Sequence, residues 1–318
     1  RVLFRSMDRN TLGQSAAKKH GKLSIFSSYF PGAGKHCRML QAGEQAQRSG
    51  TDVVIGTLSC SLWPETGTAA SRFETLPSKK MQKDGRTVEE LDLDACLKRH
   101  PDLILIGGDM LVRQDGNSYD RTVRFLEKLP AICPVYCANG NHEQKLKELP
   151  DKYEQSYEGY KKALTACGIY MLENASETVR LDEAPVRISG LEIPLGAYAR
   201  LGKKDLPLKE ITDRIGEHGE EYQILLAHHP GYIQEYLEYG ADLILSGHYH
   251  GGVMQLPGIG GVISPDFTLF PKYSGGIYRE GAQTVVVSRG LGTHSVPVRL
   301  WNWPELIVLE LSGTSEEM

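Results

Sequence analysis

Short apolar runs and helically spaced apolar residues alternate along the chain from about residue 91 to residue 311. The apolar runs predict strands over residues 102–106, 134–138, 186–193, 222–227, 242–246, 284–288 and 305–311. The helical spacing predicts helices over residues 91–99, 120–128, 153–167, 209–218 and 232–239. Because strands alternate with helices, this part of the chain is predicted to be a layered α/β domain.

The first 90 residues show a weaker pattern. Residues 22–30 and 52–62 are short strand candidates, and stretches rich in Gly, Ser, Thr and Lys lie around them. The contrast predicts three parts: an atypical N-terminal segment over residues 1–90, for which a disrupted or incomplete unit is one explanation, a folded domain over residues 91–312, and a C-terminal tail over residues 313–318.

The composition is that of an ordinary globular protein. The 318 residues are 40% hydrophobic and 24% charged with a formal net charge of −4, which argues against collagen-like and disordered chains. Basic residues are dispersed, so there is no nucleic-acid-binding signature. The six cysteines form no CxxC pair, which argues against a disulfide scaffold and a structural zinc site.

No segment of the sequence has the length and apolarity of a membrane span. The longest apolar runs are strand-sized, far below the ~20 residues that such a helix needs. The first twenty residues contain no apolar segment of a secretory signal. As written, the chain is expected to be cytoplasmic, with membrane association only through an N-terminal anchor that it does not contain. Because the sequence begins at Arg1, its native start and its compartment stay open, as does its oligomeric state.

Polar side chains that can bind metals or transfer protons follow four of the predicted strands. They are Asp109, Asn141 with His142, His228, and His248 with His250. Ligand sites of α/β sheets lie at the carboxyl ends of the strands, so we expect these side chains to converge. Oxygen and imidazole ligands without a thiolate suit zinc, manganese or iron.

Local geometry adds three expectations for these turns. In an extended segment His248 and His250 would point the same way and could face one pair of ions. Gly140 would let the backbone bring the two residues that follow it into one pocket. The second histidine of its pair, His229, is expected to pack in the loop and not to bind metal. Each turn alone has an ordinary structural explanation, and the coincidence of four turns favours a site.

Four motifs carry a resemblance to a known family: "GGDM" around Asp109, "GNHE" at 140–143, "HHP" at 228–230 and "GHYHGG" at 247–252. Their order and spacing resemble those of the calcineurin-like metallophosphoesterases. The resemblance covers residues 91–312, and its C-terminal part is similar to bacterial, often membrane-anchored, members. It implies a four-layer α/β/β/α sandwich with two divalent metal ions at one edge. The implied activity is hydrolysis of a phosphomonoester or phosphodiester by a metal-activated water.

The resemblance also implies metal ligands. Asp109 would bridge the two ions, and Asn141, His228 and His248 would complete one site. His250 would belong to the other site. Manganese, zinc or iron would be the metal.

The first motif of the family, an Asp-x-His pair that would bind the same ion as His250, is absent from residues 1–108. Three explanations stay open: a disrupted N-terminal unit, which we favour, a divergent unit with substitute ligands, or the loss of one metal site. In the first and third cases only one ion would bind. The alternative to an enzyme is then a non-catalytic metal- or phosphate-binding protein on the same fold.

His142 would be the general acid that protonates the leaving oxygen, or would hold the phosphate charge. The phosphoester itself is not identified by the sequence. Its recognition is expected in the loops over residues 144–160, 195–206 and 253–283. Two readings stay open for Arg289, which could bind phosphate or pair with an acid.

Overall fold

The computed structural model describes residues 2–4, 54–55, 74–75, 78–83, 86–91, 101–111, 118–150, 156–181, 184–198, 205–252, 255–256, 260–265, 268–292, 302, 305–309 and 311. The chain divides into two compact units, Arg1–Lys18 with His100–Met318 and Lys19–Arg99. The sequence pattern placed the border near residue 90, and it assigned residues 1–18 to the N-terminal segment. Each unit is described by itself.

In the smaller unit the described residues form two short ladders. β2 (Val54–Ile55) pairs in parallel with β3 (Glu74–Thr75), and β4 (Ser78–Lys83) pairs antiparallel with β5 (Arg86–Leu91). β2 lies inside the strand predicted over residues 52–62. The strand predicted over residues 22–30 lies outside the described residues. So does the helix predicted over residues 91–99, except for Leu91, which is the last residue of β5.

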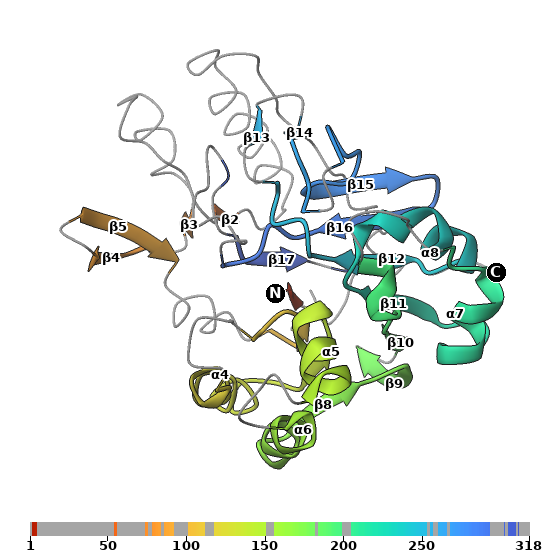
Figure 1. Ribbon diagram of the computed structural model, residues 1–318, viewed down its shortest axis with the longest axis horizontal. Helices are drawn as coiled ribbons and strands as arrows, with labels where there is room; N and C mark the ends of the chain where they lie inside the picture. The colour runs from red at the N-terminus through yellow and green to blue at the C-terminus, as the bar shows by residue number, and fades with distance from the viewer. Residues whose placement is uncertain are drawn as a thin grey trace, which may run out of the picture. The chain divides into compact units, whose positions relative to one another are not determined.

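The larger unit contains a five-stranded sheet in the order β17-β1-β6-β7-β8. Its strands are β17 (Ile307–Leu309), β1 (Val2–Phe4), β6 (Leu103–Ile106), β7 (Val135–Ala138) and β8 (Ile169–Leu172). β6, β7 and β8 run parallel, whereas β1 runs antiparallel to β6 and parallel to β17. Helices α4 (Asp120–Leu126), α5 (Asn141–Glu148) and α6 (Tyr157–Ala166) belong to this half of the unit (Figure 1).

A six-stranded sheet follows, in the order β15-β16-β12-β11-β10-β9. Its strands are β15 (Gly276–Glu280), β16 (Gln283–Val287), β12 (Leu243–Ser246), β11 (Tyr222–Ala227), β10 (Ala184–Leu191) and β9 (Ala175–Leu181). The four central strands are parallel, and the two edge strands are antiparallel to their neighbours. Helices α7 (Leu208–Ile215) and α8 (Ile233–Tyr239), with short turns η2 (Leu195–Tyr198) and η3 (Pro230–Tyr232), accompany this sheet.

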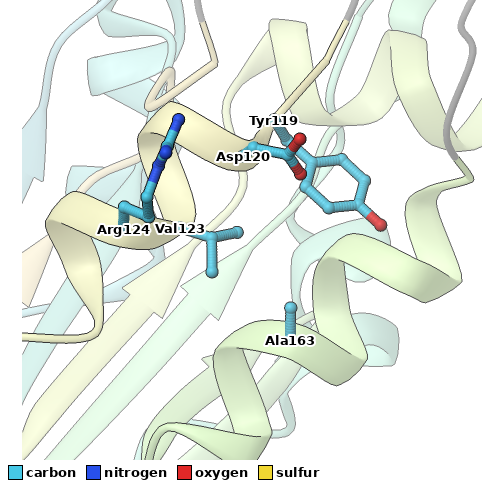
Figure 2. A pocket seen from close by; sticks show the side chains of 5 residues that line it. All are labelled: Tyr119, Asp120, Val123, Arg124 and Ala163. Atoms are coloured by element: carbon cyan, nitrogen blue, oxygen red, sulfur yellow. The ribbon is translucent and has the colours of Figure 1, made fainter.

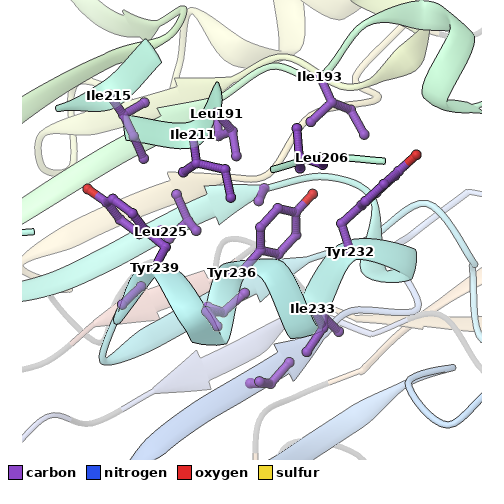
Figure 3. Close-up of a cluster of buried hydrophobic side chains, with 14 of the residues drawn as sticks. Leu191, Ile193, Leu206, Ile211, Ile215, Leu225, Tyr232, Ile233, Tyr236 and Tyr239 are labelled. Carbon is purple, nitrogen blue, oxygen red and sulfur yellow. The ribbon is translucent and has the colours of Figure 1, made fainter. Parts of the chain in front are cut away.

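Two buried clusters join these elements into layers. One holds alternate residues of both sheets, such as Leu103 and Leu105 of β6 with Ile224 and Leu226 of β11, so the sheets stack face to face. The other packs α7 and α8 on the outer face of the six-stranded sheet (Figure 3). Helices, two stacked sheets and helices confirm the predicted α/β/β/α sandwich.

Several elements differ from the sequence prediction. The loop expected over residues 144–160 begins as helix α5, which continues to Glu148. β8, β9 and β15 were not predicted. β9 and β15 are edge strands of mixed burial without a continuous apolar run, whereas β8 is a short apolar run that the prediction overlooked. Among the described residues, no helix combines the length and the apolar character of a membrane span.

Candidate metal centre

The turn after β6 presents Asp109 in an uncommon backbone conformation. Its φ is 54°, in the left-handed region, and the φ of the preceding Gly108 is 94°. Five non-glycine residues in the described ranges have positive φ, and three of them are the predicted ligands Asp109, His248 and His250. Strained backbone conformations cluster at functional sites, where they orient particular side chains. The positive φ values therefore mark these turns as candidates for a site.

The buried carboxylate of Glu143 holds this turn. One oxygen accepts from the backbone N–H groups of Asp109 (2.8 Å) and Gly140 (2.9 Å). The other accepts from those of Met110 (2.7 Å) and Leu111 (3.1 Å). Glu143 is 1% exposed, so these charge-assisted bonds lie away from water. One side chain thus ties the loop after β6 to the start of α5.

Gly140 allows the two loops to touch. A Cβ on this residue would lie 2.3 Å from Oδ1 of Asp109 and 2.5 Å from its backbone nitrogen. Its φ is −100°, which any residue can adopt, so the glycine serves close approach and not an unusual turn. The same Oδ1 accepts a hydrogen bond from the backbone N–H of His142 at 2.9 Å.

Oxygen and nitrogen atoms that accept hydrogen bonds face one another in the middle of the site. The carboxamide oxygen of Asn141 lies 3.0 Å from Oδ2 of Asp109 and 2.8 Å from Nδ1 of His248. Rotated by half a turn, the amide would instead donate to both atoms. The surroundings of this amide thus suit either orientation: its nitrogen can donate to both atoms, or its oxygen can join them as ligands of a cation.

His228 joins the same group of atoms through its other neighbours. Its Nδ1 lies 2.7 Å from the carbonyl oxygen of Gly107, which can only accept, so Nδ1 carries a proton. Its Nε2 lies 3.0 Å from Oδ2 of Asp109. Donating one ring nitrogen to a carbonyl while presenting the other is typical of a metal-binding histidine.

The loop over residues 247–252, here called the histidine loop, differs from the expectation. His248 and His250 have φ values of 58° and 49°, so the segment is not extended, and the argument from alternating side chains is wrong. His248 meets Asp109 and His228, and one ligand atom of each lies within 4.8 Å of the others. His250 lies outside this group, with its Nδ1 3.2 Å from the carbonyl oxygen of Gly292.

Electrostatics favour the metal-binding forms of Asp109 and His248, but not that of His228. Burial alone would raise the pKa of Asp109, but the neighbouring imidazoles, His228 foremost, hold that pKa below its usual value. Burial lowers the pKa of His248, and His228 lowers it further. Burial also opposes protonation of His228, yet the Asp109 carboxylate raises the pKa of that ring. An ionised carboxylate and a neutral imidazole are the protonation states that bind divalent ions.

The residues of this group fit a divalent ion of intermediate hardness, between hard ions such as Mg²⁺ and soft ions such as Cu⁺. Asp109, Asn141, His228 and His248 offer two oxygens and two imidazole nitrogens, a mixed set suited to manganese, iron or zinc. Within the described residues, this is the one place where three His, Cys, Asp or Glu side chains gather closely enough to hold a metal.

His229 sits beside the group with a structural task of its own. It is 3% exposed, and its Nδ1 accepts from the backbone N–H of Gly231 at 3.0 Å, so the side chain caps the η3 turn. Packing in the loop is what the sequence predicted for this residue.

A buried polar network braces the end of β7. Nδ2 of Asn139 donates to Glu192 at 2.6 Å and to the hydroxyl of Tyr157, which in turn donates to Glu173. Lys147 of α5 lies 3.1 Å from Glu192. The network joins α5 and α6 to the end of β10, next to the turn that carries Asn141.

Other candidate residues lie elsewhere. Arg289 pairs with Glu305 through its Nε at 2.8 Å, so of its two readings the acid pair is the one present.

A hollow of about 340 Å³ between α4 and α6 is lined by Tyr119, Asp120, Val123, Arg124 and Ala163 (Figure 2). None of the predicted site residues lines this hollow.

Sequence reasoning missed three residues around the site. Glu143 stands three residues after Gly140, a capping spacing that could have revealed it. Asn302, 2% exposed, donates to the carbonyl oxygens of His250 and Gly252, the latter at 2.6 Å. The centroid of the Tyr198 ring lies 5.1 Å from that of the His248 ring. Neither Asn302 nor Tyr198 carries a local sequence signal.

Two family models match the chain. One, described as calcineurin-like phosphoesterase, matches residues 86–252, and the other, described as the osmosensitive K⁺ channel His kinase sensor domain, matches residues 19–127. The second match begins at the first residue of the smaller compact unit. The two matches overlap over residues 86–127.

The chain is similar both to metallophosphoesterases and to KdpD sensor proteins. The uncharacterized metallophosphoesterase YkuE of Bacillus subtilis is 32% identical over 219 residues, 68% of this chain and 69% of that protein. Phosphodiesterase YaeI of Escherichia coli is 26% identical over 215 residues, 68% of this chain and 72% of that protein. The putative sensor protein KdpD of Synechocystis is 35% identical over 143 residues, 44% of this chain and only 38% of that protein.

Proposed function

Because the chain belongs to the calcineurin-like phosphoesterase family, hydrolases that act on phosphoric esters, we propose that it hydrolyses a phosphomonoester or phosphodiester at the Asp109–His248 centre. One observation carries the proposal. One ligand atom each of Asp109, His228 and His248 lies within 4.8 Å of the others. A carboxylate and two imidazoles gathered this closely suit a divalent ion such as zinc, manganese or iron.

The ligand set would be Asp109, Asn141, His228 and His248. A divalent ion bound there supplies water activation near neutral pH and offsets the negative charge of a phosphoryl group. The protein fixes the geometry beforehand. Gly107 fixes the tautomer of His228, so its Nε2 is aimed at the site.

His142 is the proposed general acid. Its backbone N–H is anchored on Oδ1 of Asp109, which fixes where the side chain starts, and its ring is only half-buried. It is near enough to help hold the pKa of Asp109 low. From there the imidazole would deliver a proton to the leaving oxygen, or hold charge on the phosphoryl group.

The test is hydrolysis of bis(p-nitrophenyl) phosphate and p-nitrophenyl phosphate by the full chain with added Mn²⁺ or Zn²⁺. We expect metal-dependent turnover that falls about 10²- to 10⁴-fold in His142→Ala while metal binding is kept. His218→Ala is the matched control, because His218 pairs with Asp242 and takes no part in the ligand group. Turnover that is unchanged in His142→Ala would contradict the proton-transfer role.

The absence of an Asp-x-His pair before Asp109 favours one alternative, a metal- or phosphate-binding protein without turnover. Metal stoichiometry by native mass spectrometry separates the two readings. One ion per chain, lost in His248→Ala and kept in His250→Ala, with no hydrolysis of either ester, would support the alternative. Two ions per chain with turnover would restore the binuclear reading, with His250 in the other site.

A further inference from the structure

His248 lacks the support that orients most metal-binding histidines. Such residues usually donate their second ring nitrogen to a carbonyl or a carboxylate, as His228 does to Gly107. Within the described ranges no hydrogen bond is found from Nε2 of His248. Its backbone is also in the left-handed region, with φ 58°. The contacts that the structure does show for this ring are with neighbouring rings.

Besides the ligand candidate His228, whose ring centroid lies 5.4 Å away, three aromatic side chains surround the ring. The Tyr198 ring lies 5.1 Å from that of His248 at 70°, an edge-to-face contact. The His229 ring lies 4.8 Å away at 39°, and the Tyr249 ring 5.8 Å away at 42°. Tyr198 and His229 also contact each other, with ring centroids 5.0 Å apart. The three rings Tyr198, His229 and His248 therefore support one another.

The supporting rings are themselves held by backbone contacts. His229 accepts from the N–H of Gly231 and packs against the wholly buried Tyr232, with centroids 5.3 Å apart at 78°. The Tyr232 hydroxyl donates to the carbonyl oxygen of Ala197, at 3.3 Å, next to Tyr198. Tyr232 thus fixes both η3 below His229 and the end of η2 at Tyr198.

We propose that Tyr198 and His229 are positioning residues for His248: their rings hold its imidazole with Nδ1 directed toward Asp109 and Asn141. They take the place of the missing hydrogen bond and need not touch the substrate. The inference rests on the metal site proposed above and adds how that site is kept in shape.

Matched substitutions separate ring shape from hydrogen bonding. Tyr198→Phe keeps the ring and removes the hydroxyl, whereas Tyr198→Leu removes the ring. His229→Phe keeps a ring without the acceptor for Gly231, whereas His229→Asn keeps an acceptor without the ring. Tyr222→Leu is the control, because Tyr222 lies at the opposite end of β11 from His228.

Two readouts do not depend on turnover: the Kd for Mn²⁺ by titration calorimetry, and the visible absorption spectrum of the Co²⁺-loaded protein. Removing support around a metal ligand typically weakens affinity about 10- to 100-fold, which we expect for Tyr198→Leu and His229→Asn, with a changed Co²⁺ spectrum. Both Phe variants and the control should stay within about threefold of the wild-type Kd.

The outcomes distinguish this inference from the proposed function. If the wild-type chain binds no Mn²⁺ or Co²⁺, the metal site fails, and the inference with it. If the wild type binds but folded Tyr198→Leu and His229→Asn bind equally with unchanged spectra, the inference alone is wrong. A Tyr198→Phe variant as weak as Tyr198→Leu would also overturn it, since the hydroxyl would then be the active group. Circular dichroism establishes which variants fold, and the two positions test the idea independently.

Discussion

Replacing Glu143 by Gln tests whether one buried carboxylate holds the two loops of the metal site together. The carboxylate accepts four backbone N–H groups, two on each oxygen. Gln has nearly the same shape but only one accepting oxygen. Its NH₂ group would face either the pair from Asp109 and Gly140 or the pair from Met110 and Leu111. Two backbone N–H groups would then face the NH₂ group of Gln, which is a donor, and would lose their acceptor.

The expected loss follows from the number of bonds broken. A hydrogen bond to a charged group contributes roughly 1.5–3 kcal/mol, and two are lost. The neighbouring bonds relax together, so we expect the low end, about 3 kcal/mol of the free energy of unfolding. In a unit of this size, about 150–250 residues, a loss of 1 kcal/mol lowers the melting temperature by ~2–4 °C. A loss of about 3 kcal/mol should therefore lower the melting temperature by roughly 6–12 °C.

Urea denaturation and differential scanning calorimetry of the full chain measure both quantities. Glu148→Gln is the matched control, because Glu148 ends the same helix and is exposed. It should change stability by less than ~0.5 kcal/mol. The Kd for Mn²⁺ should rise in Glu143→Gln, because the Asp109 turn loses its anchor. A Glu143→Gln variant as stable as the control would refute the assignment of these four bonds to stability.

Further substitutions test neighbouring parts of the site. Gly140→Ala should weaken Mn²⁺ binding, measured by calorimetry, because its Cβ would meet Oδ1 of Asp109 at 2.3 Å. Burial alone would raise the pKa of Glu173, but the Tyr157 hydroxyl and nearby lysines hold it below its usual value. Its stabilising effect is therefore present above about pH 4.5 and lost as the pH falls through the lowered pKa. In thermal melts from pH 7 to 3, Glu173→Gln should lose less stability than the wild type. Asn302→Asp places a carboxylate against two carbonyls of the histidine loop, and should lower the free energy of unfolding by about 2–4 kcal/mol in urea denaturation.

The strands were predictable because each is an apolar run closed by a turn. β11 lies at the predicted residues, and β6, β7 and β12 differ from their predictions by one residue at one end. Asp109 follows β6 of the five-stranded sheet and His228 follows β11 of the six-stranded sheet. The rule that ligands lie after strand ends identified both turns, and the stacking of the two sheets brings them together. Local sequence was enough where one strand and one turn decided the outcome.

Sequence reasoning was weaker wherever contacts distant in sequence decide. Residues 144–148 of α5 were expected to lie in a loop, but four backbone N–H groups bind the Glu143 carboxylate and anchor the start of a helix. The histidine loop was expected to be extended, whereas both its histidines have positive φ. Asn302 donates a hydrogen bond to that loop from more than fifty residues away in the sequence, and the pattern of apolar residues cannot predict such a contact.

The direction of β1 determines where its residues lie relative to the Asp109 centre. β1 pairs antiparallel with β6, with Val2 opposite Leu105 and Phe4 opposite Leu103. Its carboxyl end therefore lies beside the start of β6, at the edge of the sheet opposite Asp109. The three residues of β1 are Val, Leu and Phe, which cannot bind a metal through their side chains. Within the described residues, β1 itself therefore contributes no ligand to the Asp109 centre.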